Sequence, residues 1–102
     1  MSHPKIKGIR WLDEELPDLV AIDITLVSRK YEEMGIESPE TPSVMYADLS
    51  KLAGVSEWYP KDSDVPSEKE CFLDFEGLER FVANVTVKNA LAAWMYFKKC
   101  KQ

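Results

Sequence analysis

The chain has 102 residues, 45% of them hydrophobic and 11% aromatic, and its formal net charge is −5. This length suits one domain with one hydrophobic core and is too short for two. The hydrophobic content excludes intrinsic disorder as the default state. We therefore expect a single domain over residues 1–102, in which residues 1–8 form a flexible tail.

The charge is unevenly distributed along the chain. Residues 17–40 hold two basic and six acidic side chains, and residues 55–80 hold three basic and eight acidic ones. Residues 81–102 carry four lysines and no acid. Because nucleic acids and anionic membranes are polyanions, the acidic middle of the chain opposes binding to both. It favours a basic protein partner instead.

The cysteines and the N-terminal stretch bear on the cellular compartment. Cys71 and Cys100 cannot build a disulfide framework, although one bridge between them is possible. The stretch MSHPKIKGIRW lacks the apolar run of a signal peptide or a membrane span. The simplest interpretation is a cytoplasmic protein with two free thiols.

Two periodicities compete in the segment LPDLVAIDITLVSRKYEEMGIE. Alternate positions are apolar, as in a half-buried strand: Val20, Ile22, Ile24 and Leu26. Positions four and three apart are also apolar, as on one helix face: Val20, Ile24, Val27, Tyr31 and Met34. Pro17 suits a first helical turn, and Gly35 followed by Ile36 is typical of a left-handed C-terminal cap. These ends favour a helix over residues 17–34.

Prolines break the chain within SPETPS. A second helix is expected to begin near Pro42 and to end at Gly54. Its buried side chains are expected to be Met45, Leu49 and Leu52. Residues 55–70 form an acidic, proline-containing surface connection in this interpretation, in which Trp58 and Tyr59 anchor the loop.

Residues 71–101 are predicted to form one long helix or two helices with a bend. Asp74 suits the N-cap of this segment, and Thr86 can cap a fresh helix. The predicted fold is therefore mainly α, a compact bundle of three to four helices with a proline-containing acidic loop. The alternative is a small α+β domain with short strands near residues 6–11 and 70–74, and residues 19–27 fit either helix or strand.

The stretch ADLSKLAGVS, residues 47–56, resembles the first helix and turn of many helix-turn-helix DNA readers. Such a motif needs a second helix that enters the major groove. Pro60 would interrupt that helix, and acids such as Asp62 and Asp64 would repel the phosphate backbone. A degenerate helix-turn-helix transcription regulator is therefore only the third functional hypothesis.

Few side chains are suited to catalysis or to metal binding. His3 is the single histidine, so a catalytic histidine dyad or a histidine-rich zinc site is excluded. Cys71 and Cys100 lack the paired spacing of zinc ligands, and the four glycines stand singly, unlike those of a phosphate loop. We expect no catalytic residue, no metal, no cofactor and no enzymatic activity.

Two sets of side chains are candidate partner-binding residues. The acidic set comprises Asp18, Asp23, Glu57, Asp62, Asp64 and Glu68. The aromatic set comprises Trp58, Tyr59, Trp94, Tyr96 and Phe97. The acidic set predicts an inhibitor or regulator that binds a basic protein surface, including a nucleic-acid-binding groove. The aromatic set predicts a structural subunit or adaptor that packs through its C-terminal helix, in a homo-oligomer or on another chain.

Overall fold

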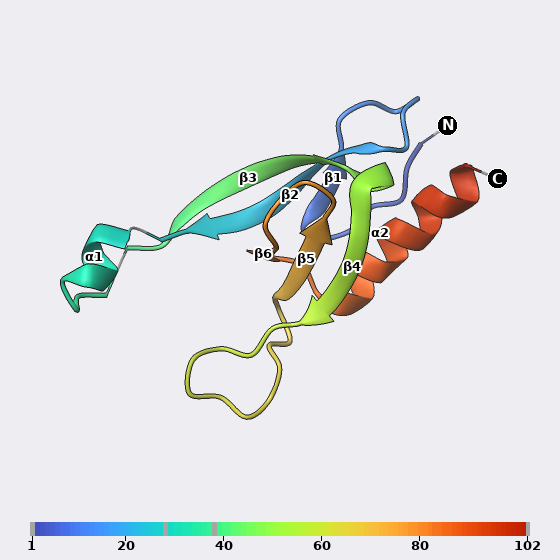
Figure 1. The fold of residues 1–102 in the computed structure, drawn as a ribbon. Helices are drawn as coiled ribbons and strands as arrows, with labels where there is room; N and C mark the ends of the chain where they lie inside the picture. The colour runs from blue at the N-terminus through green and yellow to red at the C-terminus, as the bar shows by residue number, and fades with distance from the viewer. Residues whose placement is uncertain (1, 28, 38, 102) are drawn as a thin grey trace.

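A computed structural model describes residues 2–27, 29–37 and 39–101 of the protein. Within these ranges the chain is mostly β, with six strands and one long helix near the C-terminus (Figure 1). The elements in chain order are β1 (Ile9–Trp11), β2 (Leu19–Leu26), α1 (Arg29–Glu33), β3 (Thr41–Asp48), the 3-10 turn η1 (Leu49–Lys51), β4 (Leu52–Glu57), β5 (Cys71–Phe75), β6 (Phe81–Ala83) and α2 (Val87–Cys100). The predicted bundle of three to four helices is therefore wrong.

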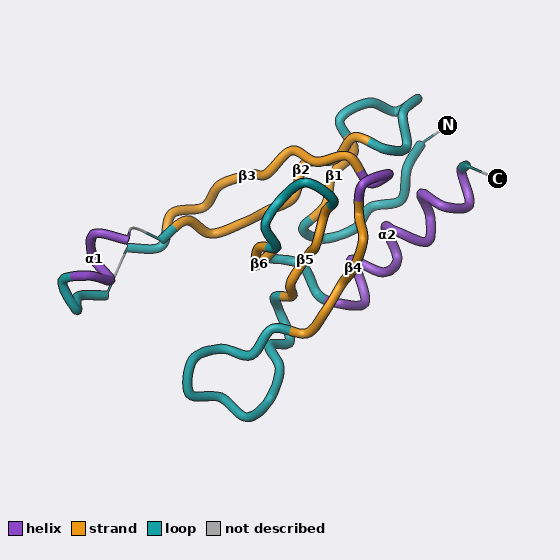
Figure 2. The backbone as a smooth tube through the Cα atoms, viewed as in Figure 1, coloured by secondary structure: helices purple, strands orange, loops and turns teal. Residues whose placement is uncertain are grey.

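The strands form two antiparallel sheets of three strands each, in the orders β1-β2-β3 and β4-β5-β6. The chain passes from the first sheet to the second at one corner, where β3 continues through η1 directly into β4 (Figure 2). The Asp48 carboxylate stabilises this corner by accepting a hydrogen bond of 2.8 Å from the Ser50 N–H. The helix α2 packs across β4 and η1.

The segment predicted as a helix over residues 17–34 is mainly the strand β2. Val20 and Ile22 are fully buried on one face and Ala21 is buried on the other, so packing on both faces and pairing with β1 and β3 stabilise the strand. The predicted cap at Gly35 is confirmed, since its φ is +71° and the Ile36 N–H donates to the Tyr31 carbonyl at 3.0 Å. It ends the five-residue helix α1 at the tip of the β2–β3 hairpin.

The second predicted helix, over residues 42–54, is also wrong. This range contains most of β3, the turn η1 and the start of β4, so residues 47–56 are not the first helix and turn of a DNA-reading motif. Pro42 pairs with Thr25 in β3, which is an edge strand of its sheet. An edge is where a strand tolerates proline.

Residues 71–101 contain two strands before the helix α2. Asp74 lies in β5 and caps no helix, whereas Thr86 caps α2 by accepting a 3.0 Å hydrogen bond from the Asn89 N–H. The prediction for Thr86 is therefore confirmed. Strands do occur near both ranges that the α+β alternative named, as β1 and β5, but four more strands accompany them.

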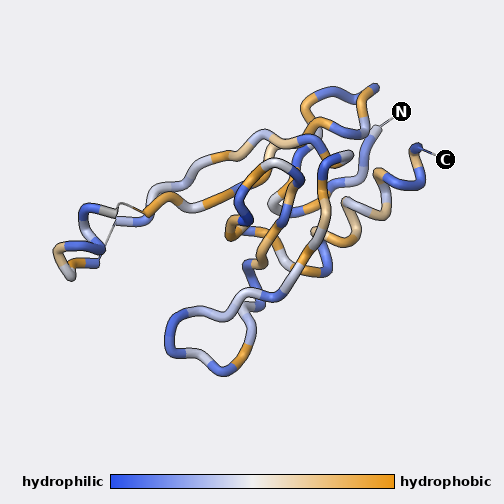
Figure 3. Tube along the Cα trace, in the orientation of Figure 1, coloured by the Kyte–Doolittle hydropathy of each residue, from blue (hydrophilic) through white to orange (hydrophobic). Residues whose placement is uncertain are grey.

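One hydrophobic core lies between the sheets and α2. The helix contributes the small residues Ala90 and Ala93, which allow close approach, and the ring of Phe97. Apolar segments occur in both sheets and in α2, whereas the long loop after β4 is mostly polar (Figure 3). The buried strand and turn residues are Ile9, Val20, Ile22, Leu49, Leu52, Cys71, Leu73, Phe75, Ala83 and Val85.

Candidate binding cleft between the two sheets

Asn84 joins the two sheets at a second corner. Its backbone N–H donates to the Asp23 carbonyl oxygen at 2.7 Å, and its side-chain Nδ2 donates to the Thr25 hydroxyl at 2.8 Å. Both bonds connect the end of β6 with the side of β2 that does not face β3. Beside this junction lies a cleft with a volume of about 590 Å³. That volume is within the range of small-molecule sites.

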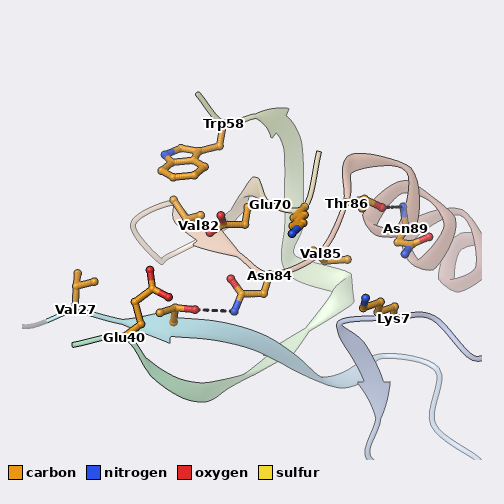
Figure 4. Close-up of a pocket in the computed structure, with 12 residues that line it drawn as sticks. Lys7, Val27, Glu40, Trp58, Glu70, Val82, Asn84, Val85, Thr86 and Asn89 are labelled. Carbon is orange, nitrogen blue, oxygen red and sulfur yellow. Dashed lines mark hydrogen bonds between the residues drawn. The ribbon is translucent and has the colours of Figure 1, made fainter. Parts of the chain in front are cut away.

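The cleft has two chemically different ends (Figure 4). Val27, Glu40 and Trp58 lie at one end, and Lys7 and Asn89 lie at the opposite end. The first end combines an aromatic ring with a carboxylate. The second combines a cation with the N-terminal turn of α2.

Glu70 supplies a second carboxylate to the wall of the cleft. Burial raises the pKa of Glu70, the negative charge of Glu40 raises it further, and Lys69 opposes both effects. Within the described part of the chain, neither Glu40 nor Glu70 has a side-chain hydrogen bond or an ion pair. The site therefore holds two neighbouring carboxylates that form no ion pair with any side chain the structure describes.

The exposed acids predicted at residues 57–70 lie on the long loop beside this cleft. Asp62, Asp64 and Glu68 are all exposed, and Asp62 adopts a positive φ of 63° at a turn. Glu57 ends β4 and accepts a 3.3 Å hydrogen bond from the Tyr59 hydroxyl. Figure 1 shows two separate projections, the tip of the β2–β3 hairpin on the left and the loop at the bottom.

The net charge of the molecule is concentrated in these two projections. Residues 29–40 hold four acids and two bases, and residues 57–70 hold five acids and two bases. Together they carry −5, which equals the formal charge of the whole chain, so the remaining residues balance. We call these two segments the acidic arms.

The other predicted acids lie outside the arms. Asp23 forms an ion pair of 2.9 Å with Arg10 on the surface of the first sheet. Asp18 precedes β2, and its backbone carbonyl accepts from the Leu49 N–H at 2.7 Å. One oxygen of the Asp18 carboxylate is buried without a hydrogen-bond partner among the described residues. The structure therefore does not gather the six predicted acids into one patch.

The predicted aromatic residues also separate into different environments. Trp58 lines the cleft, and Tyr59 is 51% exposed on the loop. Phe97 is 6% exposed and belongs to the core, and Trp94 packs against the core. Tyr96 hydrogen-bonds to the His3 ring over 2.6 Å.

A small aromatic cluster ties residues 2–5 to α2. The His3 ring stacks on Trp11 at 5.2 Å between ring centroids and meets Tyr96 edge-on at 5.6 Å. His3 Nε2 lies 2.8 Å from the Asp13 carbonyl oxygen, which can only accept, so Nε2 carries a proton. In the neutral ring Nδ1 then accepts from Tyr96. The flexible tail over residues 1–8 stays a prediction, since hydrogen bonds do not measure motion.

Of the twelve residues that line the cleft, Trp58 alone was predicted as a site residue; those missed include Lys7, Glu40, Glu70, Asn84 and Asn89. Most of them lie far apart in the sequence, and the pairing of the strands into two sheets brings them to one cleft. In the described ranges, no group of three or more acidic, histidine or cysteine side chains is arranged to hold a metal ion. None of the described helices has both the length and the apolar character required to cross a bilayer.

Comparison with known proteins found no matching family model, curated protein or solved structure.

Proposed function

We propose that the protein is a non-enzymatic binding domain that uses its acidic arms to engage a basic surface of a protein partner, as an inhibitor or regulator. The observation that carries this proposal is that two projecting segments hold the entire net charge. Concentrated charge of one sign steers and orients a partner of opposite sign. We also propose a cytoplasmic location, with which the two free cysteines are compatible.

The test compares two sets of three charge reversals. The first set, Asp62→Lys, Asp64→Lys and Glu68→Lys, reverses exposed charges on one arm. The matched control set, Glu14→Lys, Glu15→Lys and Glu76→Lys, reverses as many exposed acids outside both arms. Each tagged protein is used for affinity capture from nuclease-treated source-cell lysate, followed by quantitative mass spectrometry at low and moderate salt.

A basic partner that is captured by the wild type and the control, but at least about tenfold less by the arm variant, supports the proposal. Loss of capture as salt rises is part of the expected result, because exposed charge pairs are screened. Equal capture by all three proteins would rule out the acidic arms as the binding surface.

A structural subunit is the second candidate function, and one observation favours it. Leu91 and Met95, one turn apart on α2, are 40% and 57% exposed. Apolar side chains at this spacing form a stripe that a second helix can cover. This alternative predicts a mass that rises with concentration in light scattering and returns to the monomer value in Met95→Glu. A monomer at every concentration would exclude the homo-oligomer.

A further inference from the structure

We infer that the cleft between the two sheets binds an extended segment of the basic partner, with a lysine or arginine side chain placed between Glu40, Glu70 and Trp58. This inference rests on the proposed function and specifies the part of the partner that is recognised. It concerns the cleft, whereas the proposed function concerns the acidic arms as a whole.

The first support is an open strand edge along the cleft. The Asp23 N–H donates to the Gly8 carbonyl at 2.9 Å, and the Asp23 carbonyl accepts from Asn84, so both groups point away from β3. Alternate residues of a strand direct their backbone groups to the same side, so the N–H and C=O of Thr25, which lines the cleft, also point away from β3. Among the described residues, no backbone group bonds to Thr25 on this side.

An open edge of this kind is suited to an extended chain. A segment in β conformation can exchange backbone hydrogen bonds with Thr25, as in recognition by strand addition. Its side chains then point alternately to opposite sides. Val27 and Val82 line the same cleft and provide apolar contact for such side chains.

The second support is charge complementarity at the Trp58 end. Glu40 comes from the first acidic arm and Glu70 from the second, and both line the cleft. The charge of Glu40 raises the pKa of Glu70, so the two carboxylates are near enough for one inserted cation to interact electrostatically with both. The wall at this end includes the Trp58 indole, and aromatic faces attract ammonium and guanidinium groups. Lys7 lies at the opposite end, which leaves Lys69, beside Glu70, as the opposing charge among the described lining residues.

The probe is a short synthetic peptide of alternating lysine and valine, acetylated and amidated at its ends. Two matched peptides accompany it, one with glutamine in place of lysine and one with methylated backbone nitrogens. Binding is measured by calorimetry to the wild type, to Glu40→Gln/Glu70→Gln and to the control Glu15→Gln/Glu76→Gln. Amide hydrogen exchange of Thr25 is followed by NMR in the free and bound states.

We expect the lysine peptide to bind the wild type and the control equally and to bind Glu40→Gln/Glu70→Gln at least about tenfold more weakly. The glutamine and N-methylated peptides should also bind at least about tenfold more weakly, and exchange at Thr25 should slow in the complex. The amide exchange rate of Thr25 reports backbone pairing at this strand edge. General attraction of the peptide to a negative surface would leave that rate unchanged.

Two results would overturn this inference and leave the proposed function intact. In the first, the peptide binds equally well with methylated backbone nitrogens and to Glu40→Gln/Glu70→Gln, but it no longer binds the variant with the three charge reversals on the loop. The other is absence of peptide binding while the arm-dependent capture of a basic protein persists. If arm reversal leaves capture of the basic protein unchanged, the proposed function fails, whatever the peptide shows.

Discussion

The backbone of Gly8 lies directly against the carbonyl oxygen of Asn84. A Cβ atom at Gly8 would stand 2.6 Å from that oxygen and 3.0 Å from Cβ of Val85, and the φ of Gly8 is +93°. The segment before β1 can therefore approach the sheet junction only because residue 8 has no side chain.

Gly8→Ala should lower the free energy of unfolding by at least about 3 kcal/mol, because it combines an unfavourable φ with a backbone clash. Gly77→Ala is the matched control, since Gly77 also has a positive φ, +81°, but an added Cβ there meets nothing within 4 Å. The control should cost about 1 kcal/mol. Urea unfolding followed by tryptophan fluorescence measures both, and equal losses would show that the close approach contributes nothing.

The bond between the Asn84 and Thr25 side chains should contribute about 1 kcal/mol to stability. Asn84→Ala and Thr25→Val should each destabilise the protein, and the double variant should lose less than the sum of the two. A coupling near zero in this cycle would mean that the bond does not form in solution. Asn89→Ala, which removes another amide that lines the cleft, serves as the control.

The two thiols should react at very different rates. Cys71 is fully buried, and burial raises its pKa from 9.0 to about 11, whereas Cys100 is exposed. A rise of this size lowers the thiolate fraction at neutral pH about 100-fold. A disulfide reagent should therefore titrate one thiol in the native protein and two in urea. Rapid reaction of Cys71→Ala and slow reaction of Cys100→Ala identify the accessible thiol, and the reverse order would contradict the structure.

Glu70 should make stability depend on pH. Its pKa is raised by burial and by Glu40 from the ordinary 4.5, so the folded protein favours the protonated form. The stability linked to this proton is present below the ordinary pKa and is lost as pH rises through the raised value. Glu70→Gln, which mimics the protonated form, should therefore raise Tm slightly at pH 7 and leave it almost unchanged near pH 4.

The control for this prediction is Glu76→Gln, an exposed carboxylate outside the cleft. Its effect on Tm should be similar at both pH values. A lower Tm of Glu70→Gln at pH 7 would mean that the ionised carboxylate stabilises the fold, contrary to its surroundings.

Two local signals in the sequence, the caps at Gly35 and Thr86, were interpreted correctly, whereas the cap at Asp74 and the extents of the predicted helices were wrong. Gly35 and Thr86 cap helices as their residue types predict, because a cap depends on the few residues next to it. Residues 19–26 fit both the two-residue period of a strand and the three-to-four-residue period of a helix. The cap signals at the ends of the segment do not determine how many residues between them are helical. Pairing with β1 and β3, which are distant in the sequence, makes this segment a strand.

The candidate site was harder to predict for the same physical reason. Trp58 was selected from its own chemistry, as an aromatic residue in an acidic loop. Glu40 and Glu70 are unremarkable acids in the sequence, and they become neighbours only when the hairpin and the long loop flank one cleft. Asn84 likewise becomes a junction residue only through its bonds to β2.

Pro42 has a consequence for how these molecules behave at high concentration. It lies opposite Thr25, whose backbone groups face away from β3, so the Pro42 nitrogen lies on the outer edge of the sheet. That nitrogen has no hydrogen, and a second molecule aligned along this edge would find one donor missing. Proline at such a position disfavours the edge-to-edge stacking that leads to fibrils.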